Sequence, residues 1–193
     1  MRLIKTPVQM KVPEFLAWAE KQPETARYEI VDGEIVAMTR DTVGHNRAKF
    51  AAAIALRAAI RAAGVPCEVF IDGVGVKIKD GTLRIPDVVV HWGAGPDAGA
   101  TVVETPVIAV EVVSPSSERE DFDIKFIDYF TVSSIRHYLI VYPTKGVVLH
   151  HGRKEGGEIA SGIRHDGEIA LNPPGISVAV SALLGPSFDE AGQ

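Results

Sequence analysis

Cysteine is almost absent from the 193-residue sequence, which contains only Cys67. One cysteine cannot form a disulfide within the chain, which suits a reducing compartment, and we expect a cytoplasmic protein. Long apolar runs are also missing, since none approaches the roughly 18 to 20 residues that a membrane-spanning helix needs. The N-terminal residues lack the continuous apolar stretch of a signal peptide. The sequence therefore predicts neither a membrane protein nor an exported one.

An excess of basic residues is the next absence: 20 Lys and Arg stand against 25 Asp and Glu, a net charge of −5. Proteins that simply coat nucleic acid rely on Lys and Arg to bind phosphates, so this composition argues against such a protein. Acidic residues concentrate in 66–130, where twelve Asp and Glu accompany five Lys and Arg. Clustered carboxylates hold hard divalent cations, so a metal-dependent enzyme acting on nucleic acid stays open.

Repeats, low-complexity stretches and flexible linkers are absent from 10–185, so we expect one domain over 1–193. Its core is predicted at about 10–150, followed by a β-rich extension at 151–185. Apolar periodicity predicts helices at 12–20, 45–63 and 118–132. Strand patterns predict a hairpin at 27–38 around Asp32-Gly33 and strands at 67–71, 75–78, 83–90, 107–113, 137–142 and 146–151. This order of elements predicts an α+β fold with a mixed β-sheet.

The predicted helix at 45–63 carries four basic residues, Arg47, Lys49, Arg57 and Arg61. They could follow a phosphate backbone, but a solvated helix face is the more common explanation, and we expect it here. His45, near the start of this helix, could contact a phosphate or take part in capping.

Glu111 interrupts the apolar run at 107–113, a run typical of a central strand buried on both faces. An unpaired carboxylate buried there would cost several kcal/mol, so a partner is expected. Pro86-Asp87 precedes the apolar run at 88–90, and hairpin topology could set the two strands side by side. Both carboxylates, the backbone carbonyl of Val112 and waters would then form a Mg²⁺ or Mn²⁺ site. Alternatively, Asp87 only begins a strand and Glu111 faces solvent at a sheet edge.

Lys125 lies on the helix that follows the Glu111 strand, with Asp121 at i−4 and Tyr129 at i+4. All three therefore share one face of that helix. A helix leaning over the carboxyl end of the strand would bring the Lys125 ammonium toward the carboxylates, where it could orient or deprotonate the attacking water. The alternative is a surface ion pair between Asp121 and Lys125, worth about 0.3 to 0.5 kcal/mol.

These residues fall into four short motifs: residues 28–34 (YEIVDGE) with His45 opening a helix, Pro86-Asp87, residues 111–117 (EVVSPSS), and Asp121-x3-Lys125-x3-Tyr129. In this order and spacing they resemble the "putative restriction endonuclease" family, formerly a domain of unknown function, within the PD-(D/E)xK nuclease superfamily. The match covers roughly 10–150. It implies a restriction-endonuclease-like fold, a mixed four-stranded sheet flanked by helices, with Asp87 and Glu111 as metal ligands.

The resemblance also implies roles for two further residues, Lys125 and Glu29. In the wider superfamily a lysine lies two residues after the glutamate, but Val113 stands there in this sequence. The lysine function would move to Lys125, as it does in this family. Glu29 would be an accessory carboxylate at the metal, although a glutamate on the hairpin surface fits equally well. Further departures are Arg136-His137-Tyr138, where the family usually has a Pro-Glu-Tyr-like segment, and Tyr142-Pro143, where it usually has Asp-Pro.

The sequence therefore predicts a Mg²⁺- or Mn²⁺-dependent endonuclease that hydrolyses DNA phosphodiester bonds. We expect a homodimer, because cutting a duplex takes two strand-cleaving centres and a two-fold partner is the commonest way to supply the second. Two alternatives remain: an inactive nucleic-acid-binding module of the same fold, and an interaction protein whose acidic site is structural.

Overall fold

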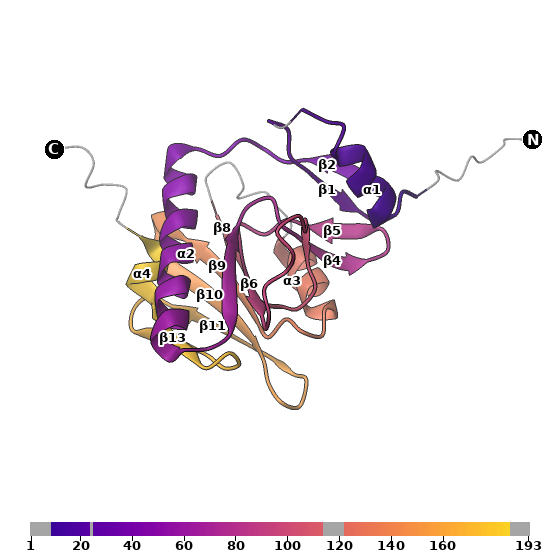
Figure 1. The fold of residues 1–193 in the computed structure, drawn as a ribbon. Helices are drawn as coiled ribbons and strands as arrows, with labels where there is room; N and C mark the ends of the chain where they lie inside the picture. The colour runs from indigo at the N-terminus through magenta and orange to yellow at the C-terminus, as the bar shows by residue number, and fades with distance from the viewer. Residues whose placement is uncertain (1–8, 24, 114–121, 186–193) are drawn as a thin grey trace, which may run out of the picture.

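The computed structural model describes residues 9–23, 25–113 and 122–185 (Figure 1). Its helices in these ranges are α1 (Val12–Ala19), α2 (Val43–Ala63), α3 (Phe122–Thr131) and α4 (Val180–Leu184), with a short 3-10 turn η1 (Pro143–Lys145). The strands of this part of the chain form a six-stranded sheet, a five-stranded sheet and a separate hairpin. The predicted α+β class and restriction-endonuclease-like arrangement are confirmed, while the single-domain division stays a prediction.

The larger sheet has the order β11-β10-β9-β8-β6-β3. Its strands are β3 (Cys67–Ile71), β6 (Val88–Trp92), β8 (Pro106–Val112), β9 (His137–Tyr142), β10 (Val147–Arg153) and β11 (Ile159–Arg164). The pair β8–β9 is parallel and the other pairs are antiparallel, so the sheet is mixed, as predicted. Within the described ranges it has two strands more than the resemblance implies, because the chain adds pairings at its edges.

The smaller sheet has the order β2-β1-β5-β4-β7. Its strands are β1 (Tyr28–Val31), β2 (Glu34–Ala37), β4 (Gly75–Lys79), β5 (Thr82–Arg84) and β7 (Val102–Val103). Asp32 and Gly33 turn the chain between β1 and β2 with φ of 51° and 84°. Positive φ at both central residues is what a tight type I′ hairpin requires, so the hairpin prediction is confirmed.

One strand prediction is wrong. The run at 83–90 does not form one strand but is divided between β5 in the smaller sheet and β6 in the larger. Pro86 cannot donate a ladder hydrogen bond, and the N–H of Ile85 donates to the Glu29 carboxylate at 2.8 Å instead of to a strand. The chain thus crosses between the two sheets at this point, and Asp87 comes immediately before β6.

Helix α2 begins two residues before the predicted start. Thr42 caps it, because its hydroxyl accepts a hydrogen bond from the N–H of His45 at 3.2 Å. The helix ends where predicted, at Gly64, which adopts a left-handed φ of 63°. For the predicted helix at 118–132, residues 118–121, including Asp121, lie outside the described residues.

Strand β8 lies between β6 and β9 and is buried along its whole length. Val110 and Val112 pack in a cluster with α2 and α4, whereas Ala109 and Val113 pack in a second cluster with α3. Figure 1 shows these helices on opposite sides of the larger sheet. Since side chains alternate along a strand, Glu111 faces the α3 side with Ala109 and Val113.

The predicted C-terminal extension is β-rich. Strand β11 lengthens the larger sheet, and the hairpin β12 (Glu168–Leu171) and β13 (Ile176–Ala179) follows. Apolar side chains of this hairpin belong to the same buried cluster as α2 and β8. The extension therefore completes the apolar layer on that side of the sheet.

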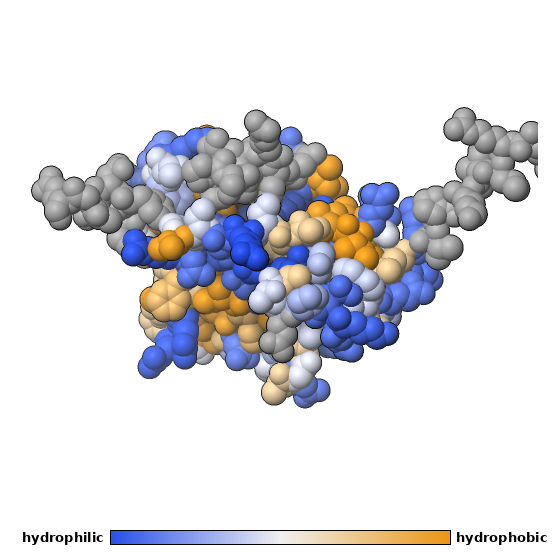
Figure 2. Space-filling view, turned by 90° about the horizontal axis from the view of Figure 1, so that it is seen from above, coloured by the Kyte–Doolittle hydropathy of each residue, from blue (hydrophilic) through white to orange (hydrophobic). Residues whose placement is uncertain are grey.

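Hydrophilic residues cover much of the face seen in Figure 2, between smaller apolar patches. Among the described residues, no helix combines the length and apolar character that crossing a membrane requires.

Candidate active site

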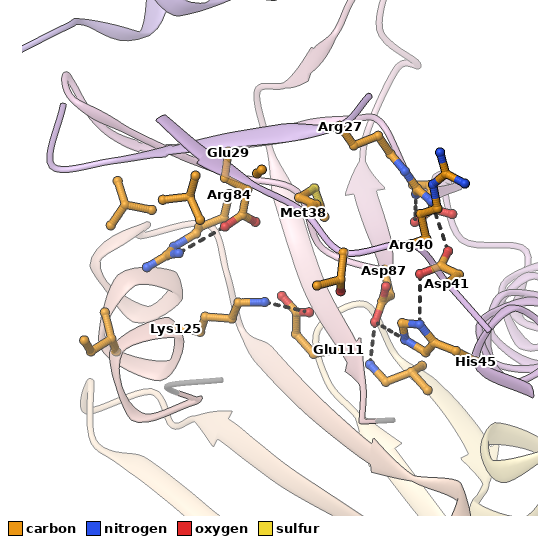
Figure 3. Close-up of a pocket in the computed structure, with 17 residues that line it drawn as sticks. Arg27, Glu29, Met38, Arg40, Asp41, His45, Arg84, Asp87, Glu111 and Lys125 are labelled. Carbon is orange, nitrogen blue, oxygen red and sulfur yellow. Dashed lines mark hydrogen bonds and ion pairs between the residues drawn. The ribbon is translucent and has the colours of Figure 1, made fainter. Parts of the chain in front are cut away.

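A cavity of about 340 Å³ lies between the β1–β2 hairpin, the start of α2, the start of β6, the end of β8, and α3 (Figure 3). Both acidic and basic side chains line it. Its charged lining residues are Arg27, Glu29, Arg40, Asp41, Asp72, Arg84, Asp87, Glu111 and Lys125, together with His45. The structure thus brings both predicted metal ligands and the predicted lysine to one cavity.

Glu111 is 4% exposed, and two groups from α3 hold its carboxylate. Lys125 Nζ lies 3.1 Å from Oε2, and the Tyr129 hydroxyl donates to Oε1 at 2.7 Å. The spacing Lys125-x3-Tyr129 explains this arrangement, because residues four apart lie on the same helix face. The alternative of a solvent-facing glutamate at a sheet edge is wrong.

The charge state of Glu111 follows from its surroundings. Burial raises its pKa to about 7, against the opposing effect of Lys125, and the negative charges of Asp87 and Glu29 raise it further. Burial also raises the pKa of Tyr129 well above its ordinary value, and the neighbouring Glu111 adds to this effect, so the phenol stays a hydrogen-bond donor. The cavity therefore holds more buried negative charge than Lys125 alone offsets.

Asp87 is fixed from two directions. The N–H of Val112 donates to Oδ2 at 2.7 Å, and the His45 ring nitrogen Nε2 lies 3.2 Å from the same oxygen (Figure 3). The Lys49 ammonium lies 3.7 Å from Oδ1. Asp87 therefore does more than begin a strand, since its side chain ties the start of β6 to the end of β8.

His45 bridges two carboxylates. Its Nδ1 lies 3.0 Å from Asp41 Oδ1, and its Nε2 faces Asp87. Burial lowers the pKa of His45, but the hydrogen bond and charge of Asp87 outweigh it, and the net shift is upward. A raised pKa favours the imidazolium, in which both ring nitrogens donate. The helix is capped by Thr42, so the side chain of His45 is not the cap and instead lines the cavity.

Glu29 is buried, so its placement on the hairpin surface is wrong. Its carboxylate accepts from the N–H of Ile85 at 2.8 Å and from Arg84 at 3.1 Å. Arg84 also donates twice to Asp128 of α3, at 2.8 and 2.6 Å. This buried network joins the small sheet to α3 and so fixes the helix that carries Lys125.

Sequence reasoning missed a second network around Lys49, and its placement on a solvated face is wrong. Lys49 is 1% exposed, and its ammonium contacts Asp41 and, at 2.8 Å, Asp72. Arg27 pairs with the same two carboxylates at 3.1 Å each. A signal was present: Lys49 continues the buried helix stripe of Ala52, Ala53, Leu56 and Ile60 at helical spacing.

Comparison with known proteins identifies the family. Residues 12–183 match the Uma2 family model, described as "Putative restriction endonuclease". The chain belongs to this family. It is also 26% identical over 181 residues to "Uncharacterized protein slr1290" of Synechocystis sp., covering 88% of each chain. A crystal structure of a "putative nuclease belonging to DUF820" from Anabaena variabilis superposes with a TM-score of 0.70 at 14% identity, covering 91% of this chain and 97% of the other, which shows the shared fold.

Lys125 of α3 and Val113, which stands where the wider superfamily has a lysine, lie on the same side of the larger sheet. Val113 is buried and packs with Tyr129 and Tyr138 on the face of β8 that carries Glu111. Lys125 reaches Glu111 from α3, which packs on this same face. Lys125 and a strand lysine at position 113 would thus approach Glu111 from the same side of the sheet.

Proposed function

We propose that this chain is a Mg²⁺- or Mn²⁺-dependent endonuclease that hydrolyses phosphodiester bonds in DNA. The observation that carries the proposal is the placement of Lys125 Nζ at 3.1 Å from Glu111 Oε2, in a cavity that Asp87 also lines. Two carboxylates and an ammonium gathered on a restriction-endonuclease-like fold are the groups that metal-assisted phosphodiester hydrolysis uses. Family membership supports the same class of reaction.

The donor set fits Mg²⁺ or Mn²⁺. Asp87 and Glu111 offer hard carboxylate oxygens, each with lone pairs beyond those used by the hydrogen bonds described above. Among the described residues, no three or more His, Cys, Asp and Glu side chains form a metal-binding cluster. Mg²⁺ does not need one, because it keeps several waters and is held by one or two carboxylates. The backbone carbonyl of Val112, whose residue lines the cavity, is proposed as the remaining protein ligand.

When bound, the metal would polarise the scissile phosphate and lower the pKa of water. Side chains and one backbone N–H of the chain would supply charge stabilisation and hold the two carboxylates in place. Lys125 places a positive charge where it steadies the attacking hydroxide or the negative charge that develops on the phosphate. Tyr129 holds Glu111 in its rotamer, while His45 and the Val112 N–H hold Asp87. Glu29 is proposed as an accessory group whose charge acts on Glu111 through space.

A second candidate is an inactive binding or interaction module. One observation favours it: Glu111 and Asp87 are both already hydrogen-bonded within the chain, as in a purely structural polar network. The homodimer and the cytoplasmic location expected from the sequence belong to the leading proposal.

The experiment is cleavage of supercoiled plasmid and of single-stranded DNA with millimolar Mg²⁺ or Mn²⁺. We expect cleavage by the wild type and a loss of about 10² to 10³ in rate for Lys125→Ala, the usual effect of removing one group that stabilises transition-state charge. Lys77→Ala is the matched control, because Lys77 is half-exposed and, among the described residues, forms an ion pair only with nearby Asp80. Absence of metal-dependent cleavage by the wild type would favour the inactive module, and full activity of Lys125→Ala would remove Lys125 from the mechanism.

A further inference from the structure

A second cavity, of about 540 Å³, continues from the active-site cavity along the first part of α2. The two cavities share five lining residues, Arg27, Met38, Thr39, Arg40 and Asp41. Beyond these, the second cavity is lined by Thr25, Thr42, Val43, Asn46 and Arg47. We call this second cavity the arginine groove. Because five residues line both cavities, the two lie next to each other, within reach of neighbouring phosphates of one strand.

The arginine groove carries more positive than negative charge, whereas Asp87 and Glu111 make their part of the first cavity acidic. It contains three arginines and one aspartate. Arg27 and Asp41 already pair with each other, which leaves Arg40 and Arg47 as its uncommitted charges. Both are exposed, and within 9–23, 25–113 and 122–185 neither side chain has a hydrogen bond or an ion pair. The two adjacent cavities therefore offer carboxylates that suit a cation in the first and, within the described residues, unpaired guanidinium groups that suit an anion in the second.

The remaining lining of the arginine groove is polar. Three threonines and Asn46 line it, against the apolar Met38 and Val43. Contacts between proteins and DNA go largely to phosphate and sugar oxygens, and they come from Arg, Lys, Ser, Thr and Asn side chains and from backbone N–H groups. Guanidinium groups bind phosphates through paired, charge-assisted hydrogen bonds. The composition of the groove matches a sugar-phosphate backbone and does not suit an apolar ligand.

We propose that the arginine groove binds backbone phosphates of the same nucleic-acid strand whose scissile phosphate lies beside Glu111 and Lys125, an inference that rests on the proposed function. Arg40 and Arg47 are the phosphate-binding residues. The strand then leaves the active-site cavity past the end of β2 and over the first turns of α2. This gives the acidic chain a local basic contact for a polyanion, despite its net charge of −5.

The test measures binding separately from cleavage. The full chain, in EDTA, is titrated into a fluorescein-labelled 12-nucleotide DNA strand, the matching duplex and an RNA of the same sequence, with fluorescence anisotropy read from 50 to 200 mM NaCl. We expect Arg40→Ala/Arg47→Ala to weaken binding about tenfold or more and to make the salt slope shallower by about two, roughly one per lost phosphate contact. The lysine pair Arg40→Lys/Arg47→Lys should keep the salt slope.

The matched control is Arg57→Ala/Arg61→Ala, which removes two exposed arginines that lie outside the groove on α2, the helix that carries Arg47. Its affinity should stay within about twofold of the wild type. Because all four arginines are exposed, the variants should share the wild-type melting temperature. If the wild type cleaves, loss of Arg40 and Arg47 should raise KM and leave kcat unchanged, since both contact the ground state as well as the transition state.

The outcomes separate the two proposals. Equal affinity and equal salt slope for wild type and Arg40→Ala/Arg47→Ala would overturn the groove and leave hydrolysis standing. Arginine-dependent binding by a wild type that does not cleave with Mg²⁺ or Mn²⁺ would overturn hydrolysis and leave the groove standing. No binding of DNA or RNA by the wild type at 50 mM NaCl, or an equal loss in the Arg57/Arg61 control, would also overturn the groove.

Discussion

Replacing Lys49 by Met removes the ammonium at the centre of the buried network beside the active site. The Met side chain keeps most of the apolar volume, so the change acts mainly on charge. In the native chain this ammonium lies against Asp41, 2.8 Å from Asp72 and 3.7 Å from Asp87. Its pKa is raised, because the hydrogen bonds and charges of these carboxylates outweigh the opposing effect of burial. The variant would leave the carboxylates without their shared cation.

Removing one partner of a buried ion pair costs about 3 to 5 kcal/mol, because the other charge is left without compensation. The lower end applies here, since Arg27 still lies 3.1 Å from both Asp41 and Asp72. For a chain of this size, each kcal/mol lowers the melting temperature by about 2 to 4 °C. We therefore expect a loss of about 3 kcal/mol and a melting temperature lower by about 6 to 12 °C.

The assay is urea unfolding followed by circular dichroism, with Arg57→Met on the exposed face of α2 as the matched control. The control should change stability by no more than about 0.5 kcal/mol. Adding Asp72→Asn to Lys49→Met should restore at least about 1 kcal/mol, because the two side chains interact directly. If Lys49→Met is as stable as Arg57→Met, or if Asp72→Asn gives no recovery, the buried-charge reasoning is wrong.

Three further predictions concern the metal, pH and assembly. Millimolar Mg²⁺ or Mn²⁺ should raise the melting temperature by mass action, and Glu111→Gln should abolish that gain. The metal-free variant should be at least as stable as the wild type, because burial and the charges of Asp87 and Glu29 disfavour the charged form of Glu111 by more than Lys125 favours it. An unchanged melting temperature of the wild type would argue against the site. Burial lowers the pKa of His137 and His150 to about 4 each, and neighbouring positive charges add to the shift. The unfolded chain therefore binds more protons than the folded chain between about pH 6.5 and 4. Stability should fall as the pH falls through that window, by at most about 3 kcal/mol per ring. Urea titrations at pH 7, 5.5 and 4.5 test this, and His137→Asn/His150→Asn should show a smaller loss than the wild type. Light scattering at micromolar concentration should give the mass of a homodimer, and a monomer would contradict that prediction.

Local sequence patterns were sufficient to predict those parts of the fold in which neighbours in sequence are also neighbours in space. The Asp32-Gly33 hairpin follows from the backbone freedom of those two residues, and the end of α2 follows from Gly64. Burial of Glu111 was predictable because its apolar neighbours place it in a central strand. The approach of Lys125 and Tyr129 to Glu111 followed from a spacing of four on a helix that covers that strand.

Long-range pairing was not predictable from these patterns. Arg84 reaches Glu29 across 55 positions and Asp128 across 44, and no local periodicity encodes either pair. The same limit explains the strand that was wrongly predicted as continuous at 83–90. Its apolar pattern continues through Pro86, while the sheet to which each half belongs depends on pairing with distant strands.

Two buried networks fix different sides of the candidate active-site cavity, and the spacing of the short motifs does not reveal either network. Glu29, Arg84 and Asp128 fix α3 against the small sheet and so hold the helix that carries Lys125. Lys49, Asp41 and Asp72 fix the start of α2 and so hold His45 against Asp87. Each network positions one side of the cavity, and the Lys49 network also reaches Asp87, whose Oδ1 lies 3.7 Å from the ammonium. The position of Lys125 therefore depends on the helix being fixed through Arg84 and Glu29, which are distant in sequence, whereas a lysine on the strand itself would be positioned by the sheet.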